Sequence, residues 1–591
     1  MAQKYKFPRV DVASYARVKS TARPETPDTT VLFMPIMSSI GPSGEIVKIH
    51  DLDEYVSYFG TPAFNMMGIS AIALTRWLNA GGTLYAYRLV ERGVKNVINN
   101  DDGPQIIEYG PEFANYALKN GGQTVFGFTA KYSGDAYNNL CLRIEPVAVS
   151  GDTYNITVWL SSDTSTRETY SRIVASQIPN VLNASSELVR DFQFDFSGLT
   201  VELGDENTRP FTLRDLVGTG MTFKMSESNN IFNAGALVLG CDVSPFLKGT
   251  KSYYELMTDA WSIAIDDKGE IMGELTRLFT NVSATTVDTI LDPGYSAELK
   301  VALYDAIHYV LQETAREDLF VAFSTCIIEE RAQEDGTKCA DGKIKRPGEF
   351  SGFGLVPTYE NGKRTNQGIP YTNDDTGETD GVDQVAGVLN GWFAVYDQYL
   401  VVTDTIYNSG ADLYVPLSVM YAQNSAYNDL VYSMHRPTAG ETYGRITGYK
   451  SINFNPNVSQ KDQLFRKRIN YAEQSARSVE IMTNRTFYHP DETGVQSPLD
   501  FVNNVRVKNK IVRDLRKILR KYLYEYADGD TLLRCQNECN AYINGWINNK
   551  ALTTGSITIE IDPYTEEYVN AALFLKFRGC VEFIDVSIYL D

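Results

Sequence analysis

Seven cysteines and four histidines are the residues of this 591-residue chain that could bind a metal ion or supply a nucleophile and its base. The cysteines are odd in number and scattered, with no CxxC pair, which predicts free thiols in a reducing compartment. Cys535 and Cys539 would share one face of a helix, but a zinc site needs two further ligands nearby. We therefore predict no metal site at this pair.

An acidic run near the middle of the chain is the second group of possible metal ligands. It lacks the spacing of an EF-hand loop, so a solvated loop is favoured over a calcium site. The acidic residues of this run are Asp374, Asp375, Glu378, Asp380 and Asp383.

The common catalytic motifs are missing from the sequence. No Walker A phosphate loop, GxSxG or HExxH occurs, and no GxGxxG lies between a strand and a helix. No histidine has a cysteine or serine partner suggested by spacing, and His308 lies in an apolar helical pattern that favours packing. We predict no catalytic residue, no cofactor and no enzyme. An α/β enzyme with its site on loops 330–385 remains the alternative from another class.

A strongly basic segment lies near the C-terminus of a chain whose net charge is -20. Residues 506–521 contain eight Lys or Arg and one Asp. On a helix their like charges repel, so the segment favours a negative surface lying against it. At 100° per residue one face is apolar, and the opposite face is a cationic stripe. The stripe consists of Arg506, Lys510, Arg513, Lys517, Arg520 and Lys521.

We interpret this stripe as a docking surface for an acidic protein. A solvated outer face is the simpler alternative for any run of charge. Nucleic acid is a third alternative, but the acidic net charge and the lack of an accompanying aromatic or glycine-rich recognition element argue against it.

The hydrophobic pattern places these segments in a chain too long for one core. Strand, helix and strand follow one another at 29–37, 65–79 and 83–90, which is typical of an α/β layer. Short alternating runs then predict an inserted β-rich domain, after which the α/β pattern returns with a helix at 296–317. Helices are predicted at 460–482, 506–526 and 532–549. No apolar run approaches membrane-spanning length, and the first residues carry no secretory signal.

We therefore predict an α/β (α+β) multidomain protein. Its expected parts are an extended arm at 1–28, a discontinuous α/β core at 29–104 plus 246–455, an inserted β-rich outer domain at 105–245, an α+β domain at 456–580 and a terminal strand at 581–591.

Both ends of the chain read as loose strands that a neighbouring subunit could accept at a sheet edge. Pairing within the chain is the alternative. The N-terminal strand would present Val10, Val12, Tyr15 and Val18, and the C-terminal strand would present Ile584, Val586, Ile588 and Leu590.

Several segments, in order, resemble the tail sheath proteins of contractile-tailed phages. "FPRVDVASYARV" is similar to the family's N-terminal arm, with Arg9 where glycine is usual. "AIALTRWLNAGGTLYAYRL" resembles its helix, glycine turn and strand. "ADLYVPLSVMYAQNSAYNDLVYSMHRPTAG" resembles a further conserved region, with Leu417 in place of a usual proline and Thr438 interrupting the last motif. The segment from 465 to 519 resembles the C-terminal helices. These matches cover about half of the chain, and residues 105–245 match nothing in the family.

The resemblance implies a mechanism. Family subunits stack as six-membered rings around a tail tube, and arms of neighbours complete a sheet in each C-terminal domain. Contraction drives the tube through the host envelope. The implied partners are further copies of the chain, the tube protein, and baseplate and terminator proteins, with no nucleic acid and no stable membrane insertion. The implied location is the virion, after synthesis in the host cytoplasm. The resemblance makes the basic helix a tube contact. A phage-tail-like bacterial injection system is the alternative within this class.

Overall fold

The protein is described by a computed structural model. The structure describes residues 30–579, except 91–95, 101–102, 108–113, 121, 149–150, 162, 203–206, 226–230, 233–237, 245–250, 264–272, 282–285, 315, 317, 333–337, 346–358, 361–362, 365–388, 404–409, 467, 477, 489–496 and 563–564. The fold is a mixture of helices and sheets. Across the described ranges, none of the helices is both long and apolar enough to cross a membrane.

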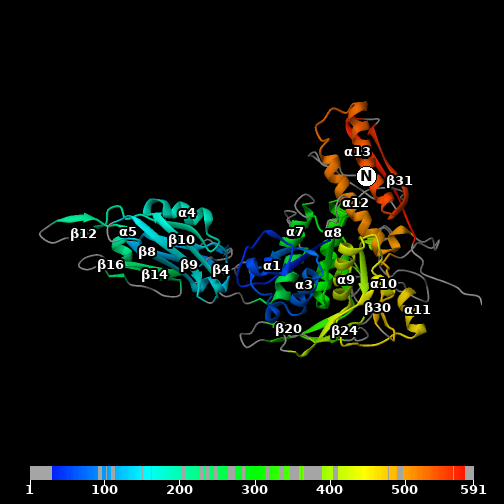
Figure 1. Ribbon diagram of the computed structural model, residues 1–591, viewed down its shortest axis with the longest axis horizontal. Helices are drawn as coiled ribbons and strands as arrows, with labels where there is room; N and C mark the ends of the chain where they lie inside the picture. Colours follow the sequence, from blue (N-terminus) through cyan, green and yellow to red (C-terminus); the bar gives the residue numbers. More distant parts are fainter. Residues whose placement is uncertain are drawn as a thin grey trace, which may run out of the picture.

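A mixed sheet forms the centre of the fold (Figure 1). In the described part of the chain seven strands build it, and every neighbouring pair is parallel except β2 with β3. The strand β1 (Val31–Ile36) lies inside the sheet, and five of its six residues are buried, which explains its continuous apolar sequence. In spatial order the other strands are β2 (Ile46–Ile49) and β3 (Thr83–Arg88) on one side of β1, and β17 (Thr289–Leu291), β18 (Val321–Ser324), β23 (Phe393–Tyr396) and β28 (Ile469–Asn470) on the other.

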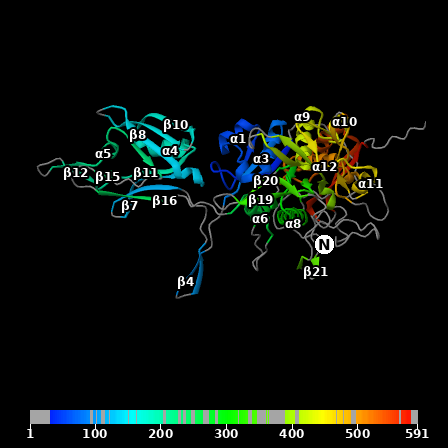
Figure 2. The ribbon, with the colours of Figure 1, turned by 90° about the horizontal axis from the view of Figure 1, so that it is seen from below.

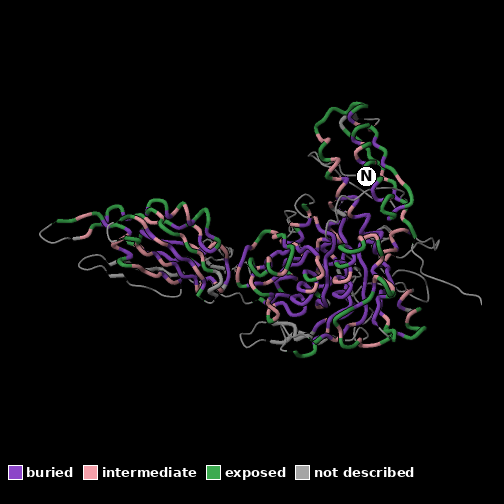
Figure 3. Tube along the Cα trace, in the orientation of Figure 1, coloured by how far each residue is buried: buried purple, intermediate pink, exposed green. Residues whose placement is uncertain are grey.

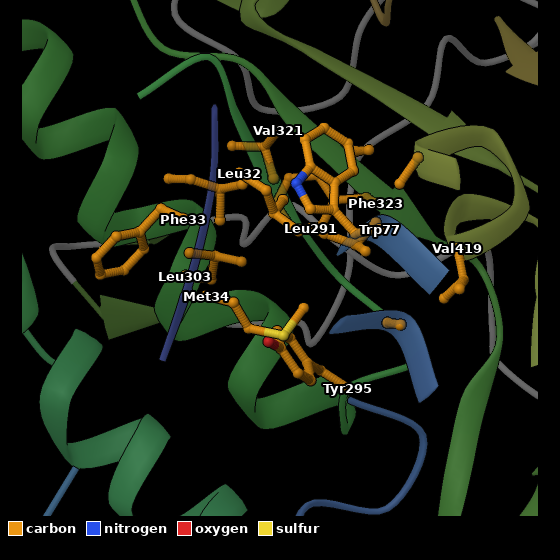
Figure 4. Packing of buried hydrophobic residues seen from close by; sticks show 14 of the residues in the cluster. Leu32, Phe33, Met34, Trp77, Leu291, Tyr295, Leu303, Val321, Phe323 and Val419 are labelled. Atoms are coloured by element: carbon orange, nitrogen blue, oxygen red, sulfur yellow. The ribbon is translucent and has the colours of Figure 1, made fainter. Parts of the chain in front are cut away.

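Helices cover both faces of this sheet (Figure 2). On one face α3 (Ile69–Asn79) packs on α9 (Leu417–Val431). On the other face α6 (Tyr253–Trp261), α7 (Glu274–Thr280) and α8 (Ala297–Glu313) pack together. Phe33 of β1 meets Phe279 of α7 edge to face, with ring centroids 4.8 Å apart. Figure 4 shows how apolar side chains from β1, β17, β18 and these helices interlock. The sequence prediction of a strand, helix and strand at the start of the core is confirmed.

A β-sandwich lies beside the core and has its own hydrophobic cluster (Figure 1). Phe126 and Phe223 pack between its two antiparallel sheets, with ring centroids 4.5 Å apart. One sheet contains β10 (Asp163–Val174), β9 (Thr153–Leu160), β8 (Leu140–Pro146) and β14 (Met221–Lys224); the other contains β11 (Val189–Phe194), β7 (Gln123–Ala130), β6 (Asn115–Asn120), β16 (Val238–Ser244) and β15 (Ile231–Phe232). The sandwich also carries α4 (Ile178–Ser185), α5 (Leu213–Val217), β12 (Thr200–Glu202) and β13 (Thr208–Pro210).

Arg88, the last residue of β3, joins the core to this sandwich. Its buried guanidinium donates to the carbonyl oxygens of Ser38 at 2.8 Å, Gly41 at 2.9 Å and Ser133 at 2.7 Å. Next to Ser133, Gly134 has a φ of +150°, and a Cβ there would lie 2.3 Å from the oxygen of Ser39. The close approach of the two backbones therefore requires glycine at this position.

Shorter elements surround the core. Two small sheets contain β24 (Tyr399–Thr403), β25 (Asp412–Pro416) and β27 (Ser451–Ile452), and β26 (Arg445–Ile446), β30 (Val479–Ile481) and β29 (Ala472–Gln474). The remaining elements of this region are α1 (Leu52–Phe59), α2 (Phe64–Met67), α10 (Gly440–Tyr443), α11 (Val458–Arg466), and the hairpins β4–β5 (Asn96–Asn100 and Gly103–Ile107), β19–β20 (Ile327–Ala332 and Lys338–Lys345) and β21–β22 (Tyr359–Glu360 and Lys363–Arg364).

One predicted helix is wrong. We expected a single helix over 460–482, but α11 ends at Arg466 and three short strands follow it. The strand β28 forms the edge of the central sheet, and Ile469, Ala472 and Ile481 are buried in the core cluster. A boundary at 456 therefore does not follow the packing, because the chain leaves the core only within the next long helix.

That helix and its partners project from the core (Figure 1). The helix α12 (Val502–Arg520) runs outward from the core cluster, α13 (Gly529–Asn548) returns, and the long strands β31 (Leu552–Asp562) and β32 (Thr565–Phe577) form a hairpin beside α13. Val507, Ile511 and Leu515 of α12 belong to the small hydrophobic cluster of this projection. Figure 3 shows that burial decreases from the base of the projection toward its tip.

Candidate assembly site: the basic helix and the C-terminal hairpin

The basic helix α12 has two halves with different surroundings. Its first half lies inside the molecule, and residues 502–509 are all buried. Its last turns are partly exposed, with Lys517 and Arg520 on the surface. The helix therefore has no continuous outward-facing stripe of charge. Instead it carries cations from the centre of the core to the surface of the projection.

Arg506 is paired within the chain. Its guanidinium forms an ion pair with Asp429 of α9 and donates to the hydroxyl of Thr30 at 3.1 Å. All three residues are buried, and the Thr30 hydroxyl also donates to Asp429. Burial disfavours the charged guanidinium, but the Asp429 carboxylate raises the pKa of Arg506 above its ordinary value. Arg506 therefore stays charged and ties α12 to α9 and to the start of β1.

Arg513 is also paired inside the molecule. It forms an ion pair with Asp288 and donates to the carbonyl oxygens of Val287 at 2.7 Å and Asp318 at 2.9 Å. One turn further along, Arg516 lies 3.6 Å from the carboxylate of Asp318. These contacts join α12 to the segments that flank β17 and β18.

Two members of the predicted stripe are thus placed differently from our expectation. Arg506 and Arg513 do not face outward, because the acidic surface that neutralises them belongs to the core of the same chain. The expectation that an unbalanced cationic helix needs a negative surface agrees with these contacts, but the surface is internal. Local periodicity cannot show this, since the acidic partners lie 77 and 225 positions away in the sequence.

The outer part of the helix is the remaining candidate for contact with another molecule. The carboxylate of Asp514 lies 3.2 Å from the ammonium of Lys510 and 3.3 Å from that of Lys517. Lys521 forms an ion pair with Glu538 of α13. The side chains of Lys517 and Lys521 are 64% and 62% exposed, so these surface pairs hold them only weakly.

The hairpin of β31 and β32 is the second part of the candidate site. In the described ranges it is a sheet of two strands, with β31 packed on α13. Leu552, Ile557 and Leu575 are buried beneath it, whereas Tyr568, Val569 and Phe574 are 48%, 43% and 46% exposed. A two-stranded sheet has two edges of unpaired main-chain groups and is marginally stable alone.

The other candidate residues from the sequence do not form a site with these elements. Cys535 and Cys539 are buried under the hairpin, and no cluster of possible metal ligands occurs among the described residues. His308 stacks on Tyr304, and burial lowers its pKa. The acidic run 374–383 and both predicted arm strands (Val10, Val12, Tyr15 and Val18; Ile584, Val586, Ile588 and Leu590) lie outside the described residues.

Comparisons with known proteins identify similar structures. No protein-family model matches the sequence, and no curated protein matches it. The chain is similar to the sheath tail protein Lin1278 from Listeria innocua, at 13% identity and a TM-score of 0.49, over 92% of this chain and 90% of that chain. It is similar to a sheath tail protein from Desulfitobacterium hafniense, at 13% identity and a TM-score of 0.42, over 93% of both chains.

The helical sheath of the anti-feeding prophage in its contracted state is also similar, at 12% identity and a TM-score of 0.45, over 100% of both chains. Because the identities are near 12% and the TM-scores are below 0.5, the functional argument rests on this chain's own residues. The chain is similar in structure to contractile tail sheath proteins along most of its length.

Proposed function

We propose that this chain is a sheath subunit of a contractile phage tail, with a structural rather than an enzymatic role. The observation that carries the proposal is the two-stranded hairpin at the end of the α12–α13 projection. Such a hairpin gains stability when further strands join it, and a chain whose sequence resembles sheath proteins at both ends can supply them from neighbouring copies.

In this proposal the subunits stack as six-membered rings around a tail tube, in the virion. The arm at 1–28 and the terminal strand at 581–591 extend the hairpin sheets of neighbours, and these links persist while the sheath shortens. The baseplate and the terminator protein hold the two ends of the sheath. Contraction drives the tube through the host envelope. A phage-tail-like injection system uses the same assembly, and its presence or absence in infectious particles distinguishes the two.

Removal of residues 1–25 tests strand exchange directly. We expect the shortened chain to stay folded, because the described core begins at Thr30, but to lose the ability to polymerise. Electron microscopy of negatively stained protein at several concentrations measures tube formation, and circular dichroism checks the fold. Tubes of normal length from the shortened chain would refute the exchange of this arm.

Charge reversal at the outer end of α12 tests the tube contact. The double change Lys517→Glu and Arg520→Glu alters two exposed residues and leaves the buried Arg506 and Arg513 in place. We expect at least a tenfold loss of assembly on the tube with little change in self-assembly, since charged contacts with small apolar area depend on sign.

A matched control reverses one exposed Lys and one exposed Arg on the core, at Lys48 and Arg445. Co-sedimentation with purified tube measures both variants. Equal binding by the two double variants would make the outer end of α12 a solvated surface.

A further inference from the structure

The hairpin of β31 and β32 has two edges, and α13 treats them differently. Asn540 of α13 accepts a hydrogen bond from the main-chain N–H of Ile557 at 3.0 Å and donates to its carbonyl oxygen at 3.3 Å. Gln536, one turn earlier, accepts from the N–H of Ile559 at 3.1 Å. Two side-chain amides thus bind the outer edge of β31 as a neighbouring strand would. This edge is therefore already occupied within the chain.

The same contacts show which main-chain groups of β32 point outward. Since both groups of Ile557 face Asn540, Ile557 and its cross-strand partner Leu573 form a non-hydrogen-bonded pair. The register is regular from Thr554 to Ile561, so the pattern alternates along the strand. The N–H and C=O groups of Val569, Ala571 and Leu573 consequently point away from β31. In the described part of the chain no strand pairs with this edge of β32.

Charge distinguishes the segments that could occupy the free edge. Residues 528–577, which comprise α13 and the hairpin, contain seven acidic and three basic residues. Residues 4–19 contain five basic residues and one acidic residue, whereas residues 580–591 contain three acidic residues and no basic one. The N-terminal segment is therefore electrostatically complementary to this unit, and the C-terminal segment is not.

We propose that strand addition to this subunit is one-sided: the edge of β32 receives residues 7–18 of a second copy, and Asn540 and Gln536 close the edge of β31. This inference rests on the proposed function and adds to it the receiving strand, the donated segment and the residues that prevent addition on the wrong side. Closing one edge suppresses the alternative register in which copies join hairpin to hairpin.

Amide hydrogen exchange of the full chain, resolved to single residues by mass spectrometry, tests the proposal. In the monomer the amides of Ile557 and Ile559 should exchange slowly, and those of Val569, Ala571 and Leu573 quickly. In the polymer the latter three should slow at least tenfold, with the β31 pair unchanged. Protection of the β32 amides already in the monomer would mean that the chain's own tail fills the edge and would overturn the proposal. So would a polymer in which they stay unprotected.

Two adjacent exposed alanines give a matched pair of variants. Ala571→Pro removes an outward N–H and leaves the hairpin ladder intact, so the variant should remain a folded monomer and lose polymerisation at least tenfold. Ala572→Pro removes an N–H that faces Thr558, so it should disrupt the hairpin itself. Normal polymerisation of the Ala571→Pro variant would refute the edge assignment and leave the proposed function standing. Failure of the unmodified chain to polymerise, alone or on the tube, would refute both.

Discussion

Replacement of Arg506 by methionine is expected to lower the free energy of unfolding of the core by about 3–5 kcal/mol, because it leaves the buried carboxylate of Asp429 without its counter-charge. Methionine keeps most of the apolar volume of the arginine stem, so the loss reports the charge rather than a cavity. Urea unfolding followed by tryptophan fluorescence measures the effect, since Trp77 and Trp261 are buried in the core.

Two control variants make this prediction specific. Arg520→Met changes an exposed arginine on the same helix and should cost less than about 0.5 kcal/mol. The double variant Arg506→Met with Asp429→Leu removes both buried charges and should recover most of the loss. A loss below about 1 kcal/mol for Arg506→Met would contradict the buried pairing that the structure describes.

Replacement of Arg88 by methionine is expected to cost at least ~3 kcal/mol, because the buried carbonyl oxygens of Ser38, Gly41 and Ser133 lose one common donor. Two of these oxygens belong to the core and one to the sandwich, so the variant should also loosen the joint between them. Limited proteolysis of the chain between residues 89 and 114 reports the joint, and urea unfolding reports the free energy.

Arg143→Met is the control for this second prediction. Arg143 lies in the sandwich and forms a surface ion pair with Glu145, in which the two side chains are 41% and 43% exposed. Its loss should cost less than about 1 kcal/mol and should not change the cleavage rate. Equal proteolysis of the two variants would show that Arg88 does not hold the joint.

The sequence predicts the core elements where the pattern is local. The strand at β1 and the helices α3 and α8 follow from apolar runs and periodicity, and the structure contains each of them. The region after Arg466 was predicted wrongly, since strands of two or three residues leave too few positions for a period of two to be recognised.

The assembly site is less accessible to sequence analysis, because its contacts join distant segments. The partners of Arg506 are Asp429 and Thr30, and no spacing near Arg506 indicates either residue. Asn540 and Gln536 give a partial signal: they lie one turn apart on a helix, among cysteines and isoleucine that face inward. Their pairing with the edge of β31 becomes visible only when the strand is placed beside the helix.

The contact between Thr30, Asp429 and Arg506 has a mechanical consequence. Thr30 immediately precedes β1, a strand that is hydrogen-bonded to parallel neighbours on both sides. A pull on the preceding residues along the strand axis would load these two rows of hydrogen bonds in shear, so that many bonds resist at once rather than opening one by one. The same residue is tied through Arg506 to α12, which leads to the hairpin. Tension that enters at one end of the described chain would therefore pass to the other through a stiff, buried connection.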